Sequence, residues 1–179
     1  MARPPLLLDA CIAINLAATD HLQHVAEELG CTFTLVQQAA AEVGYLRDSA
    51  DGNIVLTQID LTSYGSECLE IISLTPAEYP RYIDLARIVD DGEAATIAVA
   101  AKRAMALATD DRKARRLCTG LQLPEPRRTL GILHAHADAA HLPDSEVRDI
   151  LIKIRDRASY QPPRSDPDRK WWEESIADG

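Results

Sequence analysis

Near its N-terminus the chain reads Leu6-Leu7-Leu8-Asp9-Ala10-Cys11-Ile12-Ala13-Ile14, an apolar run that ends in a carboxylate and is followed by a second apolar run. Three consecutive leucines are typical of a short strand that is buried on both faces, as the strands of a parallel sheet are. The residues after Asp9 continue as a helical stretch through Leu16. The pattern therefore predicts a buried strand, a helix directly after it, and a carboxylate at their junction.

The same alternation of strand and helix recurs along the chain. Further strands are expected at residues 31–36, 69–74 and 105–109, with a short edge strand inside 121–128. The expected later helices are 21–29, 37–47, 75–89, 93–104, 111–118, 129–140 and 144–157. Residues 53–68 are ambiguous, and Ile54–Ile59 within them fit either an extra strand or one arm of a hairpin. Strands that alternate with helices predict an α/β fold, a three-layer α/β/α sandwich with a central parallel sheet of about five strands.

Length and composition indicate one globular domain. The chain has 179 residues, of which 46% are hydrophobic and 26% charged, which is ordinary for a soluble protein. Its N-terminal apolar run is too short for a signal peptide, and no run is long enough to cross a bilayer, so a cytoplasmic protein without a membrane partner is expected. We expect a domain over 1–158 and a polar, proline-bearing C-terminal tail over 159–179.

The cysteines and histidines do not form an obvious metal or disulfide framework. None of the four cysteines is part of a CxxC pair, and all are expected to be small buried hydrophobes. The pairs His21/His24 and His134/His136 lack other ligands nearby in the sequence, so we expect surface or partly buried histidines.

Acidic residues from distant parts of the chain interrupt or end apolar segments: Asp9, Glu42, Glu93 and the pair Asp110-Asp111. The carboxyl ends of parallel strands gather functional residues at one edge of a sheet, so these acids are expected to converge on one pocket. Clustered carboxylates repel one another and shift their pKa values unless a cation neutralises them. Oxygen ligands of this kind suit Mg²⁺ or Mn²⁺, which serve the hydrolysis of phosphodiester bonds.

Each acid also has a structural interpretation. Asp9 is a candidate N-cap, Glu42 a solvent-facing helical residue, and Glu93 a first-turn acid that complements the helix dipole. One residue of the Asp110-Asp111 pair is expected to cap the helix that follows. A cap needs only one aspartate, and four unrelated acids would not need this order and spacing, so the metal site is the preferred hypothesis.

Positive charge is concentrated in the middle of an acidic chain. The net charge is −9; residues 1–80 carry two basic side chains against eleven acidic ones, whereas residues 81–130 carry ten against seven. The run Arg112-Lys113-Ala114-Arg115-Arg116 directly follows the paired aspartates. Basic side chains beside an acidic pocket would hold the phosphates of a nucleic acid. The alternative is a solvated helix face.

These segments together resemble the PIN-domain family of metal-dependent ribonucleases, and within it the VapC-like toxins. The resemblance covers about residues 4–157 and lies in the segments 6–9, 42, 91–98, 107–115 and 128–133. It implies that Asp9, Glu42, Glu93 and Asp111 bind the catalytic cations and that Thr109 belongs to the site. Asp110 stays a candidate ligand, because the doubled aspartate leaves the register open by one. The third acid is often Asp in this family, whereas here it is Glu93, and the neighbouring Asp90 and Asp91 are possible substitutes.

The resemblance implies a Mg²⁺- or Mn²⁺-dependent endoribonuclease, the toxin of a type II toxin–antitoxin pair. Its partners would be RNA, a small protein antitoxin and a second copy in a homodimer, for which the Ala-rich helices are the expected contact. RNA contacts are expected at Arg112, Lys113, Arg115 and Arg116. The alternative is a catalytically silent PIN-like module that binds nucleic acid or a protein. A receiver-type phosphoacceptor would need a lysine late in the sheet, and Lys113 is the one lysine between residues 103 and 153.

Overall fold

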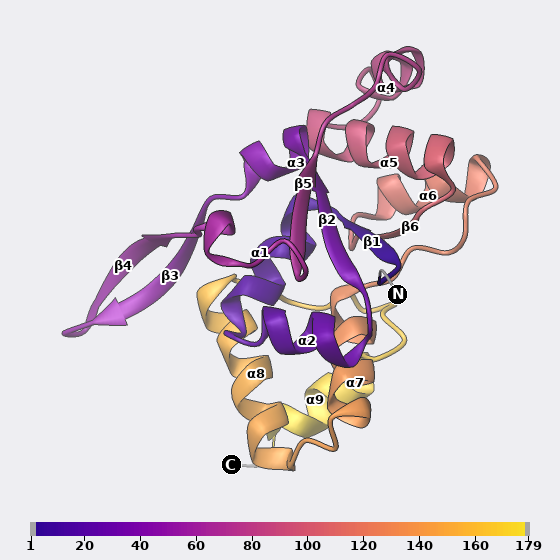
Figure 1. Ribbon diagram of the computed structural model, residues 1–179. Helices are drawn as coiled ribbons and strands as arrows, with labels where there is room; N and C mark the ends of the chain where they lie inside the picture. The colour runs from indigo at the N-terminus through magenta and orange to yellow at the C-terminus, as the bar shows by residue number, and fades with distance from the viewer. Residues whose placement is uncertain (1–2, 178–179) are drawn as a thin grey trace.

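The structure is a computed structural model that describes residues 3–177, and it has a parallel sheet between layers of helices (Figure 1). The strand order in the sheet is β5-β2-β1-β6. These strands are β1 (Pro5–Leu8), β2 (Thr32–Val36), β5 (Leu69–Ile72) and β6 (Ala106–Ala108). The helices are α1 (Ala10–Ala18), α2 (Leu22–Glu28), α3 (Gln37–Glu42), α4 (Tyr79–Leu85), α5 (Asp91–Arg103), α6 (Arg112–Gly120), α7 (Thr129–Ala139), α8 (Asp144–Arg157) and α9 (Arg169–Ala177), with a 3-10 turn η1 (Leu61–Ser63).

The leucines of β1 show why the sheet is covered on both faces. Successive side chains of a strand point to opposite faces. Leu6 and Leu8 pack in the core that contains α1, α2, α7 and α8, whereas Leu7 packs in the core formed with α5 and α6. All three side chains are almost fully buried. The predicted three-layer α/β/α sandwich with a parallel sheet is confirmed.

The parallel sheet contains four strands among the described residues rather than about five. The expected edge strand inside 121–128 is reduced to a single bridge between Ala108 and Arg127. Arg127 donates its N–H to the Leu107 carbonyl and accepts a hydrogen bond from the Thr109 N–H, each at 3.0 Å. Pro126 precedes it, and proline lacks the N–H that a ladder needs, so the pairing is not extended.

The helix predicted over 37–47 is wrong in its second half. α3 ends at Glu42, and β3 (Tyr45–Ala50) pairs antiparallel with β4 (Asn53–Gln58) in a hairpin that projects from the body (Figure 1). Asp51 and Gly52 form its two-residue loop, and both have positive φ (52° and 78°), which is the geometry of a type I′ hairpin turn. The hairpin-arm alternative for residues 53–58 is thereby confirmed.

The helix predicted over 75–89 is also shorter, because α4 begins only at Tyr79. The buried Glu78 carboxylate accepts a hydrogen bond from the Thr75 N–H at 2.6 Å and pairs with Arg103 at 2.6 Å. These bonds hold residues 75–78 as a turn that is tied to the end of α5.

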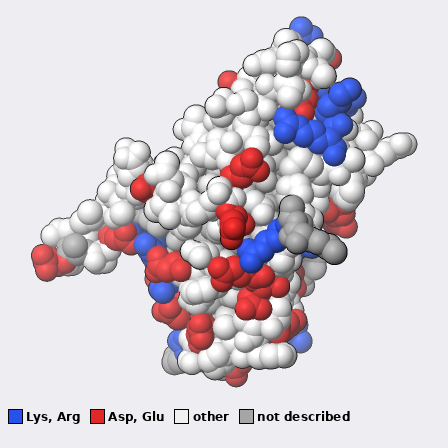
Figure 2. Space-filling view, viewed as in Figure 1, with Lys and Arg blue, Asp and Glu red and all other residues white. Residues whose placement is uncertain are grey.

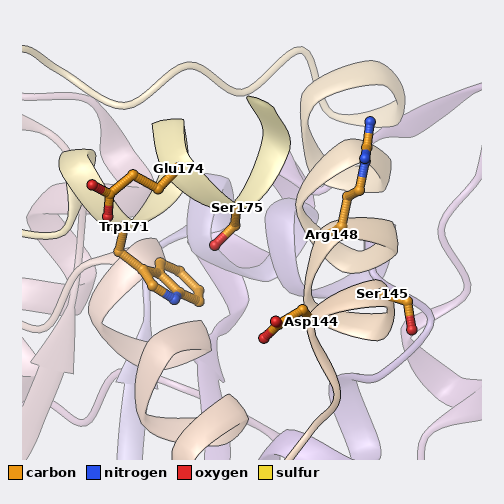
Figure 3. Close-up of a pocket in the computed structure, with 6 residues that line it drawn as sticks. All are labelled: Asp144, Ser145, Arg148, Trp171, Glu174 and Ser175. Atoms are coloured by element: carbon orange, nitrogen blue, oxygen red, sulfur yellow. The ribbon is translucent and has the colours of Figure 1, made fainter. Parts of the chain in front are cut away.

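The C-terminal segment contains α9, a helix that the sequence did not lead us to expect. Trp172 is buried, and its ring lies edge-on to that of Tyr160 at a centroid distance of 5.6 Å. A cavity of about 450 Å³ lies between α8 and α9 (Figure 3), and its described lining contains none of the predicted site residues. Residues 159–177 therefore pack on the helices before them. The domain boundary at residue 158 stays a prediction.

Two expectations about single residues are wrong. Cys11 is exposed rather than buried, whereas Cys31, Cys68 and Cys118 are buried as expected. His136 is fully buried instead of lying at the surface, and neither of its ring nitrogens has a hydrogen-bond partner among the described residues. His134 is partly exposed, as expected; its ring stacks on Trp171 at 4.4 Å.

Candidate functional site

The topology brings the predicted acids together at the carboxyl edge of the sheet. Asp9 follows β1, and Asp111 follows β6, the strand that pairs with β1 in parallel. Glu93 lies in the first turn of α5, and Glu42 is the last residue of α3, which packs against α5. Four acids from four separate elements therefore lie at the same edge of the sheet, near enough for the charges of Asp111, Asp9 and Glu42 to act on Glu93.

Asp9 is the most deeply buried of these acids, with 3% of its surface exposed. It occupies the N-cap position of α1, yet its side chain makes no capping hydrogen bond. Its Oδ2 accepts hydrogen bonds from Thr109 Oγ1 at 2.8 Å and from Cys11 Sγ at 3.3 Å. Burial raises the pKa of this carboxyl above its usual value, although the bond from Thr109 acts in the opposite direction. The structural interpretation of Asp9 as a side-chain cap therefore fails.

Thr109 connects two of the predicted ligands. Its buried hydroxyl donates to Asp9 and accepts a hydrogen bond from the backbone N–H of Asp111 at 3.1 Å. This single hydroxyl therefore fixes the position of Asp9 relative to the start of α6.

Glu42 reaches the site through a contact with Gly92. Its Oε1 accepts a hydrogen bond from the Gly92 N–H at 2.8 Å. A Cβ at position 92 would lie 2.5 Å from Glu42 Oε2, which is closer than any side chain tolerates, so the approach requires glycine. Burial, opposed by this hydrogen bond, raises the pKa of Glu42, and the nearby charges of Asp90 and Asp9 raise it further. The residue as a whole is exposed, as its solvent-facing interpretation expects, while its carboxylate is partly desolvated against the start of α5.

Glu93 has the most strongly shifted carboxyl of the group. Burial, followed by the charges of Asp111, Asp90, Asp9 and Glu42, raises its pKa to about 8. Glu93 and Asp9 line one small crevice together with Thr96 and Thr109. The neighbouring Asp90 caps α5 by accepting a hydrogen bond from the Glu93 N–H at 2.8 Å.

The doubled aspartate is divided between two helices. Asp111 caps α6, since its Oδ1 accepts hydrogen bonds from the Lys113 and Ala114 N–H groups at 2.6 and 2.7 Å. Asp110 turns to Thr129 at the start of α7 and accepts bonds from its N–H at 3.1 Å and from its Oγ1 at 2.6 Å. Both oxygens of Asp110 are thus engaged away from Glu42 and Glu93, whereas Asp111 is the charge that acts most strongly on Glu93.

The charge balance of this site fits a cation. The charges that most strongly affect the carboxyls of Asp9, Glu42 and Glu93 are all other acids. Buried carboxylates without a counter-charge are costly, and a divalent cation with a preference for oxygen would neutralise them. Within residues 3–177, however, no three such side chains are close enough to form a ready ligand set. The residues therefore fit Mg²⁺ or Mn²⁺ by their chemistry, as oxygen ligands that lack a counter-charge.

The predicted basic residues separate into two groups. Arg112, Arg115 and Arg116 line a groove of about 630 Å³, which Arg128 and Ser165 also line. Lys113 instead donates from Nζ to the carbonyl of Ile88, away from that groove. Figure 2 shows a gathering of Lys and Arg at the α5–α6 end of the molecule, while acidic side chains dominate the rest of this face.

Arg115 has a structural role in addition to lining the groove. It pairs with Glu125 at 2.8 Å and donates to the Pro126 carbonyl at 2.7 Å, which holds the segment after α6 in place. Arg112 and Arg116 are exposed. The exposed pair is therefore the part of the basic run that is best placed to meet a ligand.

Several residues around the site were not expected from the sequence. Gly92 and Thr96 lie beside the acids, and Gly92 carried a signal, because a glycine inside a helix needs a reason. Asn15 was not recognised; its Nδ2 donates to Thr129 Oγ1 at 2.9 Å and thereby supports Asp110.

Comparison with known proteins agrees with this arrangement. The sequence matches a protein family described as a PIN domain over residues 6–165. No curated protein and no solved structure matches the chain significantly. Members of the matching family are generally nucleases. Because the match spans most of the chain and the fold is the expected α/β/α sandwich, the chain belongs to the PIN-domain family.

Proposed function

We propose that the protein is a metal-dependent endoribonuclease. The observation that carries the proposal is the buried Asp9, which lies with Glu42, Glu93 and Asp111 at one edge of the sheet; no basic residue is among the charges that act on Asp9, Glu42 and Glu93. Such a group of acids is unfavourable in a protein that binds no cation. Arg112 directly follows Asp111 in the chain, and with Arg116 it lines a groove that would hold the phosphates of the substrate.

The residues divide the work of hydrolysis. Asp9, Glu42, Glu93 and Asp111 would hold Mg²⁺ or Mn²⁺, and Thr109 orients Asp9 by donating to its Oδ2. A bound cation would generate a nucleophile from water at neutral pH and neutralise charge on the phosphoryl oxygens. Burial and the neighbouring acids raise the pKa of Glu93 to about 8, so this carboxyl would have to give up a proton to serve as a ligand at neutral pH. No serine or cysteine nucleophile is needed.

Replacing Asp9 by Asn tests this proposal. The change preserves shape but removes the charge, and because supporting residues around metal ligands already change activity by about 10- to 100-fold, we expect cleavage of single-stranded RNA with Mn²⁺ to fall about 100-fold or more. Without metal the Asp9→Asn protein should melt at the same or a higher temperature, since one repelling carboxylate is lost. Asp84→Asn, at an exposed acid outside the site, is the matched control. Undiminished cleavage by Asp9→Asn would refute the metal mechanism.

The competing function is a silent module that binds nucleic acid or protein. It predicts that the wild-type chain binds RNA, with affinity that falls as salt rises, yet produces no cleaved ends with Mg²⁺ or Mn²⁺. The site favours the enzyme, because a phosphate-binding module has no use for four clustered acids. The same incubation of RNA with and without metal separates the two functions.

We further propose a toxin role with a small protein antitoxin, a homodimer and a cytoplasmic location. The resemblance to VapC-like toxins supports these points, and the acidic residues 1–80 suit a basic partner segment. The described helices include none that is long and apolar enough to span a membrane. The Ala-rich face of α5 is buried in the protein's own core, so a homodimer would use another surface than the one expected. Co-expression with the product of a neighbouring short reading frame, followed by purification and a toxicity assay, tests the pairing.

A further inference from the structure

The β3–β4 hairpin projects from the body of the protein directly after one of the proposed metal ligands (Figure 1). β3 begins at Tyr45, three residues after Glu42 at the end of α3. Three residues of chain span at most about 11 Å, so the base of the hairpin lies beside the acidic site. Each strand has six residues, which makes an arm about 20 Å long. A substrate that extends beyond Glu42 therefore meets this arm.

The two faces of the hairpin differ. Leu46 is buried, and Asp48 pairs with Arg157 of α8 at 2.7 Å, so this inner face packs on the body. Because successive side chains of a strand alternate, Tyr45 and Arg47 point to the outer face. Both residues are exposed, and 56% of the Tyr45 surface is accessible. The outer face therefore presents an aromatic ring and a cation to solvent, two residues apart on one strand.

The opposite strand adds apolar side chains to the outer face. Leu56 lies directly across from Arg47, and Ile54 lies across from Ser49. Leu56 and Ile54 are 62% and 76% exposed. β4 itself contains no charged residue, and the acidic Asp51 lies at the tip of the hairpin, the end away from the acidic site. The outer face thus offers surface on which bases can pack, together with one positive charge for a phosphate.

The size of the outer face suits a nucleic-acid strand better than a protein partner. Two strands of six residues cover on the order of 200 Å². A standard protein–protein interface buries about 800 Å² on each partner. One ring and one neighbouring cation match one base and one phosphate, and a base must be unpaired to stack on a side chain.

We propose that the outer face of the hairpin holds single-stranded RNA beside the acidic site, with Tyr45 stacking on an unpaired base and Arg47 contacting a phosphate. The inference rests on the proposed ribonuclease function and specifies its substrate class as single-stranded RNA. Two separate elements then contact the strand: the arginine groove, which follows Asp111, and the hairpin, which follows Glu42.

Binding of a fluorescent oligouridylate, measured over a salt series with a chelator so that no RNA is cut, tests the proposal. Tyr45→Ala should bind at least about fivefold more weakly, which is the lower value of one stacked base. The salt dependence of its binding should not change, because tyrosine carries no charge. Tyr45→Phe keeps the ring and should bind within about twofold of the wild type.

Two further measurements separate the ring from the cation and single strands from duplexes. Arg47→Ala should flatten the salt dependence by about 0.7 in the logarithmic slope, the value of one phosphate contact on a single strand. Duplex RNA should bind equally well to Tyr45→Ala and to the wild type, because its bases are already paired and stacked.

Matched controls come from exposed residues of α4. Tyr79→Ala and Arg81→Ala should leave RNA binding unchanged. The proposal would be overturned if Tyr45→Ala bound oligouridylate as tightly as the wild type, if it lost as much affinity for duplex RNA, or if Tyr45→Phe were as weak as Tyr45→Ala. It would also be overturned if Leu56→Asp converted a dimer to a monomer in sedimentation while RNA binding stayed intact, because the outer face would then join two copies.

These binding measurements do not need cleavage, so they keep the hairpin separate from the enzyme. Weaker binding of single strands by the Tyr45→Ala and Arg47→Ala proteins, with no cut ends from the wild type in Mn²⁺, would support the hairpin while refuting the nuclease. Cleavage by the wild type, with unchanged binding by both variants, would refute the role of the hairpin alone.

Discussion

Replacing Glu93 by Gln should make the metal-free protein more stable at neutral and alkaline pH. In the folded chain, burial and the charges of Asp111 and Asp90 hold the Glu93 pKa at about 8, against 4.5 for an ordinary glutamate. Below pH 4.5 both folded and unfolded chains keep the proton, so the group has no effect. Between pH 4.5 and 8 the unfolded chain releases a proton that the folded chain keeps, so stability falls as pH rises through this window.

The magnitude follows from the size of this pKa difference. One pKa unit corresponds to 1.36 kcal/mol, so full expression of the change would destabilise the fold by about 5 kcal/mol. Because Glu93 is only half-buried, solvent screens much of this energy. We therefore expect Glu93→Gln to unfold with a free energy about 1–2 kcal/mol above the wild type at pH 8, and with no difference at pH 4.

The assay is urea unfolding in the presence of a chelator, measured from pH 4 to pH 9. With Mn²⁺ in place of the chelator, the order should reverse, because a ligand that binds only the folded state stabilises it and the variant lacks one ligand. The reasoning would be refuted if the two proteins differed by the same amount at all pH values. It would also be refuted if the wild type were the more stable protein at pH 8 without metal.

Three further variants have expected outcomes. Gly92→Ala should keep the fold, because alanine favours a helix, and a melting curve checks this. The same variant should cleave RNA at least tenfold more slowly, because the new Cβ displaces the Glu42 carboxylate. Arg112→Ala with Arg116→Ala should weaken RNA binding and flatten its salt dependence, measured by titration at several salt concentrations. Burial lowers the His136 pKa below 6.5, so the free energy of unfolding should fall as the pH drops below that value. In urea unfolding, His136→Leu should reduce this loss of stability between pH 6.5 and 5.5 by up to about 1 kcal/mol.

Each of these changes has a control in the same chain. Gly44→Ala places its Cβ in open space and should leave cleavage unchanged. Lys113→Ala removes a cation that points away from the arginine groove, so the salt dependence of RNA binding should stay as in the wild type. His141→Leu removes an exposed histidine and should leave the acid slope as it is. Equal effects of a variant and its control would contradict the corresponding structural argument.

The sheet and half of the site could be predicted because they depend on local patterns. Leu6–Leu8 and Leu107–Ala108 are short apolar runs that favour buried strands, and in parallel strands the residues that follow them lie at the same edge. This places Asp9 beside Asp111 without further information. Glu42 and Gly92 are different, because their contact joins residues fifty positions apart and depends on how α3 packs against α5.

The helix predicted over 37–47 was too long, and the helix α9 within 159–179 was not predicted, because one local signal outweighed another that was also present. The Ala-rich start of α3 favoured a longer helix, although Asp51-Gly52 is the strongest short signal for a hairpin. In the C-terminal segment, prolines indicated a tail, whereas the burial of Trp172 against Tyr160 and the stacking of Trp171 on His134 attach a helix to the domain. Composition describes a segment's average, and one buried tryptophan is not visible in an average.

Sequence spacing alone did not assign the roles of Asp110 and Asp111. A capping role was expected for one of the two residues, which would leave the other for the metal. In the structure Asp111 both caps α6 through Oδ1 and acts as the strongest charge on Glu93, while Asp110 binds Thr129 through both oxygens. Capping and metal binding are therefore not alternatives, because a carboxylate has two oxygens and a cap uses one. The cap holds Asp111 still, and a side chain that is already ordered loses less entropy when it binds a cation.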